Sequence, residues 1–92
     1  MIVRIMGEGQ LTLDGDRVTE LNPLDNELLA AVESGDETAF RRTLGVLLDG
    51  VRRLGTPLPD DALAPSELIL PAADATLDEV RAMLSEDGLI PG

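Results

Sequence analysis

The chain has 92 residues and a formal net charge of −11, because 18 acidic side chains face seven basic ones, all of them arginine. It contains no histidine and no cysteine, which excludes serine-histidine triads, histidine-zinc sites, thiolate nucleophiles and disulfides. The negative electrostatic field of such a chain repels phosphate groups. We therefore expect neither direct nucleic-acid binding nor attachment to anionic lipid surfaces.

The core is expected to be thin and aliphatic. Apolar residues make up 43% of the chain, yet Phe40 is the single aromatic side chain. Charged residues interrupt every apolar run far short of the roughly 20 residues that span a bilayer, and residues 1–6 lack a signal-peptide core. We therefore expect a cytoplasmic protein with no direct membrane insertion.

The N-terminal residues predict a β-hairpin. Residues 2–6 and 10–13 are rich in apolar and β-branched side chains, and the glycines of residues 7–9 suit a tight turn between them. Residues 14–16 are expected to close the second strand.

Two helices are predicted next. Asn22 can cap a helix whose first position is Pro23, and Gly35 ends it. Asp36 is the expected N-cap of a second helix reaching residue 54, whose apolar side chains recur at spacings of three and four: Phe40, Leu44, Leu47, Leu48, Val51 and Leu54. The short connection predicts an antiparallel helical hairpin.

The remaining residues predict a short strand and a last helix. A proline-containing loop over residues 57–65 precedes an apolar strand at residues 68–70. Thr76 and Glu79 have the spacing of a capping box, opening a helix to about Ser85, with Gly88 as the stop signal and residues 89–91 folding back onto the body. The fold class is thus α+β, as a single small domain over residues 1–92.

Carboxylate chemistry is the remaining option for catalysis. Asp60 and Asp61 form the tightest acidic pair in a loop, a pattern more typical of solvated turns. Residues 14–16 begin like a calcium loop, but Val18 and Thr19 stand where oxygen and glycine are needed. We therefore expect no catalytic residue, no metal site and no cofactor.

The second helix carries a candidate protein interface. Two arginine pairs eleven residues apart share a side of the helix, and an apolar residue lies between them: Arg41, Arg42, Val46, Arg52 and Arg53. In so acidic a chain, such a row is a candidate contact for a partner protein.

A plainer interpretation of these arginines stays open. Glu37 can pair with Arg41, and Asp49 with Arg52 or Arg53, across one helical turn. Each pair would add only a few tenths of a kcal/mol.

The order of motifs resembles the PspAA family, the proteins associated with phage-shock protein A. The segments that carry the resemblance are residues 1–10, 21–28, 57–61, 66–71 and 84–92. It implies an accessory or adaptor protein of the envelope-stress response, acting with phage-shock protein A, a coiled-coil protein that remodels membranes. It implies no catalytic residues, and recruitment to the inner face of the membrane through the partner.

Two other functions remain open at this point. Val46 and Leu29 widen the apolar stripes, which would suit an acidic structural domain that assembles with itself. A small-molecule-binding enzyme subunit would instead show a deep polar pocket with convergent acids.

Overall fold

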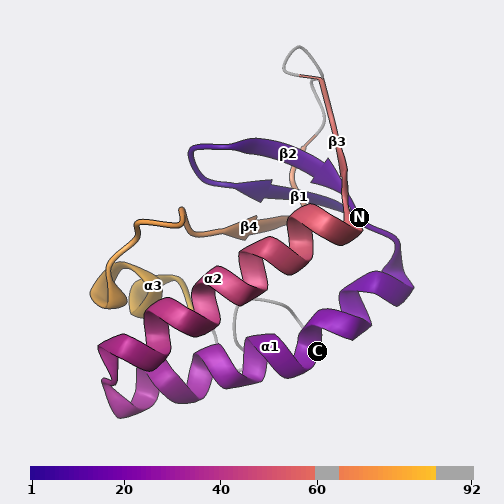
Figure 1. Ribbon diagram of the computed structural model, residues 1–92. Coiled ribbons are helices and arrows are strands. Elements are labelled where there is room, and N and C mark those ends of the chain that lie inside the picture. Colours follow the sequence, from indigo (N-terminus) through magenta and orange to yellow (C-terminus); the bar gives the residue numbers. More distant parts are fainter. Residues whose placement is uncertain (60–64, 85–92) are drawn as a thin grey trace.

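The computed structural model describes residues 1–59 and 65–84. Three helices and four strands follow in the order β1 (Ile2–Ile5), β2 (Gly9–Thr12), α1 (Gly15–Ser34), α2 (Glu37–Leu54), β3 (Thr56–Pro57), β4 (Leu68–Leu70) and α3 (Leu77–Met83). Figure 1 shows the sheet on one side of the α1–α2 hairpin, with α3 near the closed end of that hairpin. The predicted α+β class is confirmed.

The sheet has the strand order β3-β2-β1-β4. β1 and β2 form the predicted antiparallel hairpin, with Val3 opposite Leu11. β4 lies parallel to β1, with Val3 opposite Leu68. Parallel strands need a long crossover, which the helical hairpin supplies here. Alternation then sends one set of side chains into the core: Val3, Ile5, Leu11, Leu68 and Leu70.

The sequence analysis missed β3. Thr56–Pro57 pairs with β2 at the edge of the sheet, with Leu11 opposite Pro57. Proline lacks the amide that a central strand must donate, so a strand containing it belongs at an edge. A two-residue strand also has too little alternation to be recognised in a sequence.

The predicted start of α1 is wrong. The helix begins at Gly15 with Asp14 in the N-cap position, so Pro23 lies inside it. An interior proline costs about 3 kcal/mol because it removes a hydrogen bond and crowds the preceding turn. Burying Leu21, which lies before Pro23 and is 2% exposed, offsets much of that cost. Packing of the earlier turns therefore outweighs the local preference of Pro23.

The predicted end of α1 and the whole of α2 are confirmed. Gly35 adopts φ = 73° and its amide donates to the carbonyls of Ala31 and Val32. The Asp36 side chain accepts a hydrogen bond from the Ala39 amide at 3.1 Å. The antiparallel hairpin then buries the expected stripe of α2 up to Val51, together with Thr43 and Gly50, whereas Leu54 is half-buried.

The predicted capping box opens α3. The Thr76 hydroxyl accepts from the Glu79 amide, and the Glu79 carboxylate accepts from the Thr76 amide, each at 3.1 Å. The helix ends at Met83, slightly earlier than expected. Arg81 of this helix donates to the Val32 carbonyl of α1 at 3.0 Å, so α3 satisfies an acceptor at the C-terminal end of α1.

Three sequence-based expectations lie outside the described residues: the Asp60–Asp61 pair, the stop at Gly88 and the fold-back of residues 89–91. Within residues 1–59 and 65–84, none of the helices combines the length and the apolar character that crossing a bilayer requires.

Candidate protein-binding surface

α2 divides the five candidate interface residues between two of its sides. Its buried stripe faces the core, and successive residues turn by about 100° around the helix. That rotation places Arg42, Val46 and Arg53 on the side away from the core. It places Arg41 and Arg52 on the flank nearer the β1–β2 turn. All five residues are exposed.

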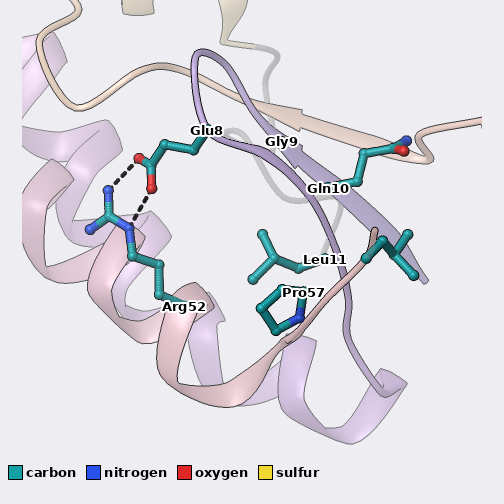
Figure 2. A pocket seen from close by; sticks show the side chains of 7 residues that line it. Glu8, Gly9, Gln10, Leu11, Arg52 and Pro57 are labelled. Atoms are coloured by element: carbon teal, nitrogen blue, oxygen red, sulfur yellow. Dashed lines mark hydrogen bonds and ion pairs between the residues drawn. The ribbon is translucent and has the colours of Figure 1, made fainter. Parts of the chain in front are cut away.

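Arg52 is committed to contacts within the chain. Its Nε donates to Glu8 Oε1 at 2.8 Å and its Nη2 donates to Glu8 Oε2, which makes a bidentate ion pair. Its Nη1 donates to Asp49 Oδ1 at 2.7 Å. Figure 2 shows the guanidinium reaching from α2 to Glu8 in the turn between β1 and β2. Arg52 therefore holds the β-hairpin against α2.

This ion pair lowers the pKa of Glu8 below its ordinary value, chiefly because Arg52 donates hydrogen bonds to the charged carboxylate. Partial burial opposes the shift, and the positive charge of Arg52 adds to it. The same contact raises the pKa of Arg52. Glu8 is thus a charged structural group at neutral pH, since its carboxylate is already paired.

The other arginines of α2 differ from Arg52. Of the local pairs considered from the sequence, Asp49–Arg52 is present. Within the described part of the chain, Arg41, Arg42 and Arg53 form no ion pair, so the expected Glu37–Arg41 pair is absent there. These three exposed guanidinium groups are therefore not paired with any described residue.

A shallow cavity of about 260 Å³ lies beside the Glu8–Arg52 pair (Figure 2). Its walls come from β2, the β1–β2 turn, α2 and β3: Glu8, Gly9, Gln10, Leu11, Arg52, Pro57 and Leu58. Among the described residues that line it, Glu8 is the single carboxylate, and it is paired with Arg52. Acid-base catalysis with two carboxylates needs a second acid nearby, so this cavity does not have the form of such a site.

Metal binding was also considered for the described residues. Among them, no group of three or more acidic side chains is arranged to hold an ion. An open groove of about 440 Å³ lies between α1 and α2. The arrangement offers surfaces for contact with another molecule.

Sequence reasoning missed Glu8 as the partner of Arg52. The two residues are 44 positions apart, and spacing rules for ion pairs apply only within one helix or between known neighbouring strands. The available signal was a charged residue between two glycines in a tight turn, which places that side chain at the surface.

Comparison with known proteins supports one assignment. A search of curated proteins and a search of solved structures each gave no match. The model of one family, described as PspA-Associated protein, matches residues 1–92. With the whole length matched, the chain belongs to the PspAA family of PspA-associated proteins.

Proposed function

We propose that this protein is a non-enzymatic accessory factor that binds a phage-shock protein A-like coiled-coil protein. The observation that carries the proposal is the family match over residues 1–92, since the family is described by its association with PspA. The role we infer is that of an adaptor in the envelope-stress response.

The chemistry of the chain supports binding as its mode of action. The sequence has no imidazole and no thiol, and the one carboxylate among the described residues that line the cavity, Glu8, is already paired with Arg52. The surface of α2, by contrast, presents guanidinium groups that form no ion pair with the described residues, and an apolar side chain, Val46, that is 46% exposed. Arginine is enriched at protein interfaces.

The proposed location is the cytoplasm, with recruitment to the inner face of the membrane through the partner. The net charge of −11 opposes direct contact with anionic lipids. Binding to a partner that itself contacts the membrane avoids this repulsion.

Co-expression with the phage-shock protein A homologue of the same organism tests the proposal. The affinity-tagged chain should retain the homologue through washes at low ionic strength, and light scattering on the eluted material should give the mass of a complex. An unrelated coiled-coil protein, expressed in the same way, is the control. Elution of the tagged chain alone, under conditions in which both proteins are folded, would reject the proposal.

A further inference from the structure

The outer side of α2 carries a straight row of four residues, which we call the outer stripe: Arg42, Val46, Asp49 and Arg53. Their spacing of four, three and four residues keeps them on one side of the helix. The two arginines at its ends are about 16 Å apart along the axis. A row of this length matches the contact that one straight helix makes with another.

The charge of the outer stripe is opposite to that of the chain as a whole. Arg42 and Arg53 are exposed and form no ion pair with the described residues, although 18 acidic side chains are present in the sequence. Asp49, the acid within the stripe, contacts Arg52 instead. The guanidinium group binds carboxylates in a bidentate manner, so the stripe has two places for acidic side chains of a partner.

An open groove lies next to the Arg42 end of the stripe. It runs between α1 and α2, has a volume of about 440 Å³, and is lined by Glu27, Ala30, Ala31, Ser34, Ala39, Arg42 and Thr43. Its alanines are short, which lets the axis of a third helix come close. Val46 is 46% exposed beside it and supplies an apolar contact.

The α1 rim of the groove has the opposite charge. Glu27 lines the groove and is exposed on α1, whereas Arg42 lines it from α2. Carboxylates of a third helix are attracted to the α2 rim and repelled by the α1 rim. The charges therefore determine which side of that helix faces α2.

We propose that the outer stripe and the groove together bind one helix of the coiled-coil partner. Two acidic positions of that helix, about eleven residues apart, contact Arg42 and Arg53, and an apolar position between them packs on Val46. This inference rests on the proposed function and assigns it a surface. The inference predicts acidic contact positions on the partner. The net charge of −11 alone would instead favour a partner with a basic face.

Charge reversal tests the sign of the contact. Arg42→Glu and Arg53→Glu should each weaken binding of the phage-shock protein A homologue, and the double variant should weaken it roughly tenfold or more. Arg4→Glu is the matched control, because Arg4 is an exposed arginine on β1 and changes the net charge equally. Its affinity should stay within about twofold of the wild type. Circular dichroism confirms the fold of each variant.

Two results of these binding measurements would overturn the proposal. If the double variant binds as tightly as the wild type, the outer stripe is not the contact. If it binds more tightly, the partner presents a basic face there. Failure of the wild-type chain to bind at all would instead reject the proposed function itself, so the two claims fail separately.

Cross-linking tests the position of the contact. The chain has no cysteine, so Val46→Cys and Ile69→Cys each introduce a single thiol at sites of similar exposure, 46% and 48%. Val46 lies on the outer side of α2, whereas Ile69 lies on the outer side of β4. A short heterobifunctional cross-linker, with a maleimide that reacts with the thiol and a photoreactive group that inserts into a nearby partner residue, should join the partner to the Val46→Cys variant and not to the Ile69→Cys variant. The reverse pattern, or a cross-link at position 46 only to a second copy of this chain, would contradict the assignment.

Discussion

Arg52 and Arg53 are neighbours in the sequence and have different roles. Arg52 makes a bidentate contact with Glu8 and a further one with Asp49, while Arg53 forms no ion pair within the described residues. The sequence placed both in one candidate interface, because spacing along a helix does not reveal which side chain meets a turn 44 residues away. The contact with Glu8 sets Arg52 apart from the free arginines.

Replacing Glu8 with Gln should lower the free energy of unfolding by about 0.5–1 kcal/mol at pH 7, a typical value for a partly exposed ion pair. Because the folded protein lowers the pKa of Glu8, the pair stabilises the fold above the ordinary pKa of 4.5. Its contribution is lost as the pH falls through the lowered value. Urea unfolding of wild type and variant at pH 7 and at acidic pH measures the difference.

The wild type and Glu8→Gln should therefore converge in stability as the solution is acidified. Glu27→Gln, which removes an exposed carboxylate that forms no ion pair with a described residue, should leave the free energy of unfolding at pH 7 within about 0.5 kcal/mol of the wild type. A Glu8→Gln protein that is as stable as the wild type at pH 7 would show that the contact contributes nothing.

Thr76 provides a second test at the residue scale. Thr76→Ala removes the hydroxyl that accepts from the Glu79 amide, and a lost cap lowers stability by about 1 kcal/mol. Thr38→Ala is the matched control, since Thr38 is exposed in the first turn of α2 and Asp36 is the cap there. Thermal unfolding should show a lower Tm for Thr76→Ala alone; equal Tm values would contradict the role of the capping box.

At the scale of elements, the two glycines inside α2 differ. Gly50 is needed for close packing of the helices, whereas Gly45 only lowers the helix propensity of α2. A methyl group at Gly50 would lie 3.0 Å from Leu21 Cδ2, whereas one at Gly45 would meet nothing within 4 Å. Gly50 therefore lets α1 and α2 approach closely. Gly45 has no such function.

Gly45→Ala should accordingly stabilise the protein by up to about 1 kcal/mol, because alanine favours the helix over glycine by that amount. Gly50→Ala gains the same preference, but the contact with Leu21 offsets it, so its net effect should be smaller or destabilising. Chemical unfolding of both variants beside the wild type tests this order. A larger gain in stability for Gly50→Ala than for Gly45→Ala would mean that the packing of α1 against α2 does not require a glycine at position 50.

Local signals predicted α2 and α3 well and α1 badly. Asp36 and Thr76 are caps followed directly by the apolar spacing of their helices, so pattern and cap agree. In α1 the strongest local signal, Asn22 before Pro23, lies inside a helix that packing extends back to Gly15. The local preference of Pro23 for a helix start does not reflect the burial of Leu21. That burial favours a helix that already begins at Gly15.

For the whole molecule, the sequence predicted the class and left the topology open. The hairpin follows from its turn, but the position of β4 beside β1 depends on a crossover through two helices. β3 at the opposite edge left no readable pattern. The contact between Arg52 and Glu8 could not be predicted from the sequence, because it depends on this topology; the candidate interface itself stays a prediction.

Charge is distributed unevenly over the molecule. The net charge is −11, yet α2 carries three exposed arginines that form no ion pair with the described residues, and exposed glutamates such as Glu20 and Glu27 lie on α1. In the proposed complex, a partner helix at the hairpin would meet this local charge pattern rather than the net charge.

Titration calorimetry of the purified chain against the phage-shock protein A homologue of its own organism tests the central claim most directly. The account predicts saturable binding at low ionic strength, with an affinity that falls as salt is added and charges are screened. An absence of binding at low ionic strength, with both proteins folded and at concentrations well above those in the cell, would contradict it.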